Sequence, residues 1–387
     1  MAVYLILFAF ILLLGLKIAP NGEYHEDFVS LKISKGIQGF CAILIIAHHF
    51  AQGIIQKNQD AGAMSIFNNA GYLLVAVFFF FSGYGLYKSF KNKPGYMNGF
   101  LKKRLPVVLV PLYVINTIFT VIVFLTGNKY YGDMNPLSFG INTLLFKITT
   151  LLGITLMNSN AWFMVTITLF YIAFYFIFRN AKDESKAIRN MGIFTVLYAV
   201  FSICLYSLIM VNELNMCFWF TMEWWYNSSF IIFIGLIFAK NEEKIINYAQ
   251  EHYAVLLIVF LLGTAGMYFA SVFVTSNPAI TAYNPLPIGR ACAFLCYVVQ
   301  TISETAFIAL ILLITMKVQF NNVILNFLGK IALEIYLIHR LYLGIFRSEG
   351  LNIQSNITYC ALVYLCTIVS AFILHYMNNA IVKAIKK

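Results

Sequence analysis

Two adjacent histidines, His48 and His49, lie inside an apolar stretch that runs from residue 36 to residue 56. Ionisable side chains are costly in the interior of a membrane and usually mark a functional site there. An imidazole has an ordinary pKa of about 6.5, so near neutral pH it can accept a proton from a hydroxyl group. The pair is therefore a candidate for base or proton-relay chemistry. The alternative is two structural histidines bonded to neighbouring carbonyl groups.

A helix over this stretch determines where the two rings point. At about 100° per residue, Lys35 and His49 lie on nearly the same face, and a rise of 1.5 Å per residue separates them by about 21 Å. Gln38 falls on that face as well. Because His48 points about 100° away from His49, only one of the two rings can face a given partner, and the helical phase favours His49.

The composition indicates what kind of element carries these histidines. Hydrophobic residues make up 61% of the 387 residues, charged residues only 11%, and the mean hydropathy is +0.81. This mixture is far from that of a soluble domain. Apolar runs of about twenty residues recur, whereas barrel strands would be about ten residues long and would alternate. We therefore expect an all-α polytopic membrane protein embedded in the lipid bilayer.

The apolar runs predict about eleven transmembrane helices. They fall at about 2–19, 36–56, 67–87, 105–127, 161–179, 190–211, 217–239, 253–275, 290–316, 324–346 and 357–377. A further apolar segment at 142–157 is short and interrupted by polar residues, so we interpret it as interfacial or re-entrant. The first run lacks a basic start and a convincing cleavage site, which favours a retained helix over a signal peptide.

The distribution of lysine and arginine orients these helices. The net charge of +11 is concentrated in alternate loops: 88–104, 179–189 and the C-terminal tail are basic, whereas 212–216 and 276–289 contain no lysine or arginine. The positive-inside rule therefore places the N-terminus outside and the C-terminus in the cytoplasm, which predicts a multi-pass protein of the cytoplasmic membrane. The same rule accounts for the positive charge, so we do not expect nucleic acid as a partner.

Further polar and aromatic side chains fall in the outer half of this bundle. His339 lies at a depth similar to that of His49, in a span that runs in the same direction, and Trp162 and Glu223 lie at the outer ends of their spans. They predict a polar, aromatic-lined cavity, although for a single tryptophan a place in the interfacial belt is the alternative. Glu304 lies deep in a span, where a carboxylate must be paired or functional.

The cysteines indicate no metal or disulfide chemistry. The chain has seven, most of them inside apolar segments, and no pair has the spacing of metal ligands. We therefore expect neither a disulfide nor a bound metal.

Five motifs follow one another along most of the chain. They are KGIQGFCAILIIAHH at 35–49, FFFFSGYGL at 78–86, FLKKRLPVVLVPLY at 100–113, NAWFMVTITLFY at 160–171 and LGKIALEIYLIH at 328–339. In this order they resemble the membrane acyltransferase-3 family, which acylates carbohydrates and other envelope molecules. The resemblance implies an acyltransferase-like membrane domain of ten helices within residues 21–387, preceded by one extra transmembrane helix in residues 1–20.

The resemblance also implies a reaction. The expected activity is that of an O-acyltransferase, most specifically an acetyltransferase, which moves an acetyl group from cytoplasmic acetyl-CoA or another acyl-CoA to a hydroxyl of an envelope or exported carbohydrate. The alternative is a transporter or flippase for a glycan or a small solute, in which the buried histidines and Glu304 form a proton relay.

The candidate residues take roles in this scheme. His49 or His48 would act as base or relay nucleophile, and Glu304 would orient a histidine or pair with a lysine. The phosphates of the donor would bind cationic side chains, for which the candidates are Lys35, Lys102, Lys103 and Arg104. The acceptor would contact Ser82, Trp162, Glu223, Tyr336 and His339. For the basic loop the alternative is topological anchoring, and for Ser82 with Gly83 it is close helix packing.

Overall fold

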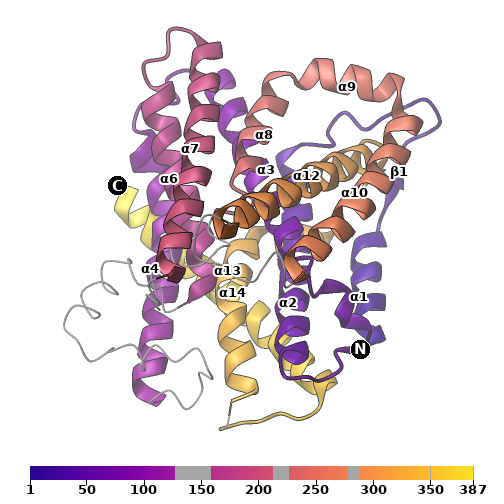
Figure 1. Ribbon diagram of the computed structural model, residues 1–387, viewed down its shortest axis with the longest axis vertical. Helices are drawn as coiled ribbons and strands as arrows, with labels where there is room; N and C mark the ends of the chain where they lie inside the picture. The colour runs from indigo at the N-terminus through magenta and orange to yellow at the C-terminus, as the bar shows by residue number, and fades with distance from the viewer. Residues whose placement is uncertain (127–157, 212–225, 278–287, 349, 387) are drawn as a thin grey trace.

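The computed structural model describes residues 1–126, 158–211, 226–277, 288–348 and 350–386, which are almost entirely helical (Figure 1). The helices are α1 (Ala2–Leu13), α2 (Leu31–Ile55), α3 (Gly71–Asn92), α4 (Phe100–Thr126), α6 (Trp162–Phe178), α7 (Glu184–Val211), α8 (Phe230–Lys240), α9 (Glu242–Glu251), α10 (Tyr253–Ser276), α12 (Ile288–Lys317), α13 (Val323–Phe346) and α14 (Asn356–Lys386). Short 3-10 helices, η1 (Gly62–Phe67) and η3 (Ser159–Ala161), and two antiparallel strands, β1 (Lys17–Ile18) and β2 (Val318–Gln319), join some of them.

The all-α membrane class is confirmed, but eleven membrane spans are not. Seven of the described helices are long and apolar enough to cross a bilayer, namely α2, α3, α4, α7, α10, α12 and α14. The helices α1, α6 and α8 are apolar but have only 12, 17 and 11 residues. The segment expected at 142–157 and the first part of the one at 217–239 lie outside the described residues.

The first helix is shorter than the sequence predicts. It ends at Leu13 rather than at residue 19, because Gly15 adopts a positive φ of 66° and the following Lys17–Ile18 pairs with β2. Twelve residues rise about 18 Å, which is less than the roughly 30 Å of a bilayer core. Asn322, which caps α13, also donates its side-chain amide to the carbonyl groups of Ile11 and Leu14 and so ties α1 to α13.

The helices α2 and α13 pack side by side (Figure 1). They run parallel, because Gly39 meets Gly329 and His49 meets His339. Their backbones nearly touch at Gly39 and Gly329, where a β-carbon on Gly39 would lie 2.4 Å from the Gly329 nitrogen. Small residues allow such close approach between membrane helices, where packing rather than the hydrophobic effect drives association. The same device joins α3 and α8, since a β-carbon on Gly83 would overlap the carbonyl oxygen of Ile232. Close packing at Gly83 is therefore confirmed.

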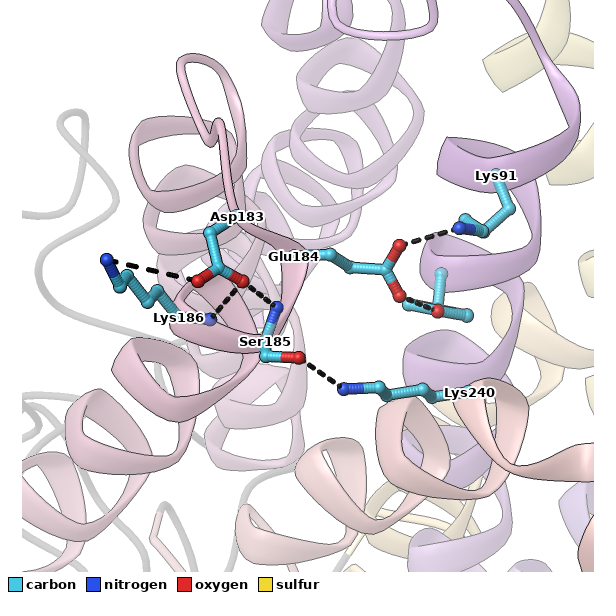
Figure 2. A network of polar contacts seen from close by, with 7 residues as sticks. Lys91, Asp183, Glu184, Ser185, Lys186 and Lys240 are labelled. Atoms are coloured by element: carbon cyan, nitrogen blue, oxygen red, sulfur yellow. Dashed lines mark hydrogen bonds and ion pairs between the residues drawn. The ribbon is translucent and has the colours of Figure 1, made fainter.

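A polar network joins α3, α7, α8 and α9 at one end of the bundle, which we call the basic end. Glu184 at the start of α7 accepts hydrogen bonds from Lys91 (2.6 Å) and Tyr87 of α3, and Lys240 donates to Ser185 at 3.1 Å (Figure 2). Glu242 likewise binds Lys88 at 2.7 Å. Two lysines at the end of α3, Lys88 and Lys91, are thus neutralised within the protein.

The N-terminal segment is held at the same end. Tyr24 donates to the carbonyl of Gln250, the last residue but one of α9, at 3.0 Å. Lys317, at the end of α12, donates to the carbonyl groups of Pro20 and Glu23 and lies 4.3 Å from the centre of the Tyr24 ring.

We predict that Gly39→Ala lowers stability by about 1–3 kcal/mol, because the new methyl group meets the backbone of α13 and forces the two central helices apart. The thermal unfolding midpoint of the protein in detergent measures this effect. Gly53→Ala is the matched control, since a β-carbon there meets nothing within 4 Å on the same helix. Equal midpoints for both variants would contradict the proposed crossing.

Candidate active site

Three imidazole rings form a row between the two central helices. His48 and His49 lie on α2 with ring centres 4.7 Å apart, and His339 of α13 lies 5.2 Å from His49 with the two ring planes only 21° apart. His48 and His339 are buried, whereas part of His49 is accessible. The structure therefore brings together His49 and His339, which the sequence assigned to separate motifs. Of the two neighbouring rings on α2, His49 is the one that stacks on His339, and its role as a base stays a prediction.

His48 is held by the backbone around the start of α3. Its Nδ1 lies 2.8 Å from the carbonyl oxygen of Phe67 in η1. Its Nε2 packs against Gly71, where a β-carbon would lie only 2.3 Å away. Both ring nitrogens are thus engaged or covered, a geometry that fits the structural alternative better than a base.

Among the described residues, only one of the two ring nitrogens of His49 has a hydrogen-bond partner. Its Nδ1 lies 3.1 Å from Oε1 of Gln52, one turn further along α2. A proton on Nδ1 that is donated to this oxygen leaves the lone pair of Nε2 available, and the bond also holds the ring in place. This arrangement suits a base and differs from that of His48.

Two asparagines position His339. Asn160 Nδ2 lies 3.3 Å from His339 Nε2, while His339 Nδ1 lies 3.2 Å from the carbonyl of Ile335. Asn158 donates to the carbonyl of Leu337 at 2.7 Å, and its side-chain oxygen accepts the Asn160 backbone N–H. Sequence reasoning missed both asparagines and Gln52. The sequence did contain signals for them: two asparagines just before the helix that begins at Trp162, and a glutamine one turn beyond His49.

An aromatic wall extends from the histidines. Tyr336 is buried with its ring centre 6.2 Å from that of His339, and Phe163 lies 5.7 Å from Tyr336. Trp162 packs 6.3 Å from Phe163 and is also buried. The predicted acceptor residues Tyr336 and Trp162 therefore belong to one surface, whereas the predicted Glu223 lies outside the described residues.

Glu304 belongs to a second polar group on α12. It accepts a hydrogen bond from Ser228, and the neighbouring Ser303 hydroxyl lies 2.9 Å from the hydroxyl of Tyr72. Within the described ranges, the pairing of Glu304 with a histidine or a lysine is not found, and its buried Oε2 has no hydrogen-bond partner. Tyr72 directly follows Gly71, the glycine that packs against His48. The polar group around Glu304 and the histidine row are therefore neighbours at the start of α3.

The predicted cationic residues lie away from the histidines. Lys102 and Lys103 are exposed on the first turn of α4, and Arg104 is half-buried with its Nη2 donating to the Tyr96 hydroxyl at 2.7 Å. They follow the end of α3, a helix that begins at Gly71 beside His48 and rises about 33 Å over its 22 residues. Lys35 is also exposed, near the start of α2 and about 21 Å from His49.

In the described structure, Ser82 makes no hydrogen bond to the histidines. It instead interacts with Tyr171, which is also close enough to interact electrostatically with Arg104. Ser82 and Arg104 therefore border the same part of the bundle. Within the described ranges, no group of three or more histidine, cysteine or acidic side chains is placed to hold a metal ion.

The family of the chain follows from a sequence comparison. A family model described as an acyltransferase domain matches residues 33–376, a range that includes all three clustered histidines. A search of the curated proteins found no match, and neither did a search of the solved structures. Since the matched range covers most of its length, the chain belongs to the membrane acyltransferase-3 family.

Proposed function

We propose that this acyltransferase is an O-acetyltransferase that moves the acetyl group of acetyl-CoA to a hydroxyl of an envelope or exported carbohydrate. The observation that carries the proposal is His49: its ring stacks on His339, is oriented by Gln52, and is partly accessible. An oriented imidazole with one free nitrogen is what a hydroxyl needs in order to become a nucleophile.

His49 acts as the base in the proposed reaction. Its Nε2 accepts the proton of the acceptor hydroxyl while the hydroxyl oxygen bonds to the carbonyl carbon of the thioester. The carbon–sulfur bond then breaks, and the CoA sulfur leaves as a thiolate that takes the proton back from His49. Asn160 keeps His339 stacked against His49, and the aromatic wall of Tyr336 and Phe163 provides a surface for a sugar ring.

The donor enters, in this proposal, from the basic end of the bundle, which faces the cytoplasm together with the C-terminus. Lys88 and Lys91 are paired with Glu242 and Glu184, and Arg104 is bonded to Tyr96. Lys102 is exposed and, in the described part of the chain, has no such partner. It is therefore the most available cation for the CoA phosphates, whose thioester would reach along the bundle toward His49.

A transporter or flippase is the second candidate, because Glu304 is fully buried with one unpartnered oxygen in the described structure. Such a carboxyl group suits a proton relay. Substrate uptake into liposomes that follows a pH gradient, with no thioester consumed, would favour this candidate over acyl transfer.

We predict that the purified protein releases CoA thiol from acetyl-CoA when a suitable glycan acceptor is present. His49→Ala should lower this rate by about 100-fold or more, because a positioned base contributes about that much. His48→Ala should act mainly on stability, because its ring supports Gly71. An unchanged transfer rate in the His49→Ala protein would refute the base role, and a failure to bind acetyl-CoA would shift weight to transport.

A second prediction concerns Gln52. Gln52→Leu should lower kcat by about 10-fold while leaving the KM values nearly unchanged, since it removes the acceptor that orients His49. Gln52→Glu keeps an oxygen at that place and should restore most of the activity. Equal losses in both variants would show that Gln52 acts only through packing.

A third prediction concerns the donor. Lys102→Gln should raise the KM for acetyl-CoA about 10-fold with little change in kcat, because a charge-assisted hydrogen bond to phosphate is lost. Lys383→Gln, which removes an exposed lysine from the end of α14, is the control for net charge. If both substitutions change the KM for acetyl-CoA equally, the lysine of the loop acts only through the net charge of the protein and does not form a donor site.

A further inference from the structure

Arg340 stands directly beside the histidine row and has no role in the reaction described above. It follows His339 within α13, six residues before the end of the helix, and its side chain is half-buried. Its charge interacts with the rings of His48, His49 and His339. Arg340 is therefore the cation next to the row: it directly follows His339, whose ring stacks on His49 at 5.2 Å.

The guanidinium of Arg340 differs from those of Arg104 and Arg347, the other half-buried arginines of the described structure, in its partners. Arg104 donates to Tyr96, and Arg347 donates to Asn356 and lies over the Tyr359 ring. For Arg340, the described residues supply no hydrogen bond and no ion pair. Burying part of a charged side chain costs free energy unless the charge is paired or binds a ligand. Five N–H donors are thus available next to the histidine row.

We propose that Arg340 binds a negatively charged group, either a carboxylate or a phosphate, on the acceptor carbohydrate. This inference rests on the proposed function and defines its substrate class. The flat fork of a guanidinium matches the oxygens of both groups and binds them through two parallel hydrogen bonds. An anion held there supplies the missing counter-charge and places a hydroxyl of the same sugar next to His49.

The cations proposed for the acceptor and for the donor lie at different places in the bundle. Lys330 is exposed on the same helix, ten residues before Arg340, and Lys102 lies on the first turn of α4. Neither is placed beside the histidines, so an anionic sugar is directed to the site by Arg340 alone among these three cations. The phosphates of the donor and the anion of the acceptor are thereby bound at separate places.

The test measures binding, so that it does not depend on turnover. Three soluble sugars serve as probes: glucuronate, glucose 6-phosphate and neutral glucose, titrated into the purified protein in detergent. We expect one or both charged sugars to bind about 10-fold or more tightly than glucose. The charged sugar that binds more tightly shows whether the site prefers a carboxylate or a phosphate. Equal affinities for all three sugars would overturn the inference.

Substitutions of Arg340 and Lys330 test whether Arg340 causes the preference for charged sugars. Arg340→Gln should abolish the preference for the charged sugar and leave glucose binding unchanged, whereas Lys330→Gln on the same helix should preserve the preference. Should Arg340→Gln fold poorly, Arg340→Met provides an uncharged side chain of similar length for this half-buried place and should abolish the preference equally. A preference that persists in the folded variant would refute the role of Arg340.

The two hypotheses can fail separately. CoA release that depends on His49, without any preference for charged sugars, would retain the acetyltransferase and reject the anionic acceptor. Arg340-dependent binding of a charged sugar without CoA release would retain the anion site and reject acyl transfer.

Discussion

The contact between α2 and α13 is the constraint on which the site depends. Gly39 and Gly329 let the two backbones touch, and the helices run parallel from that point. Ten residues further along each helix stand His49 and His339, whose rings stack at 5.2 Å. Because both helices rise equally per residue, a contact between small residues at one level brings the imidazoles together at another. No bond between the rings themselves is needed to define their spacing.

The two ends of the bundle use polar side chains in different ways. At the basic end, Glu184 and Glu242 neutralise lysines of α3 and join helices that are distant in sequence. These pairs are partly exposed, so each adds little stability, and their main effect is to fix neighbouring helix ends. Around the histidines, amide side chains and carbonyl groups bond to the rings, and no carboxylate does so in the described part of the site. The rings are therefore oriented without an added negative charge.

The pair His48 and His49 shows how one residue step separates two environments. One ring is covered by the start of α3, while the next ring along the helix faces His339 and remains partly accessible. Gly71 makes this possible because any larger residue would occupy the place of the His48 ring. Glu304 is likewise set apart, on a helix that reaches α3 through Tyr72 and Ser303. Residues that the sequence grouped as one catalytic set thus divide into two adjacent polar groups.

The sequence by itself determined the class of the protein and the phase of its most informative helix. Long apolar runs allow only helices in a bilayer, and the angle per residue already favoured His49 over His48. The order of the five motifs indicated the family. Helix ends were harder to predict: α1 stops early because Gly15 turns the chain and Lys17–Ile18 finds a strand partner three hundred residues away.

Only the tertiary structure decided which side chains meet. The bonds from Gln52 to His49 and from Asn160 to His339, the cover over His48, and the pairing of Glu304 with Ser228 all depend on how helices pack. Periodicity reports which face of a helix a residue occupies, but not which helix lies opposite. That choice depends on close contacts such as Gly39 with Gly329, whose partners are distant along the chain, and for this reason the structure alone revealed the row of three imidazoles.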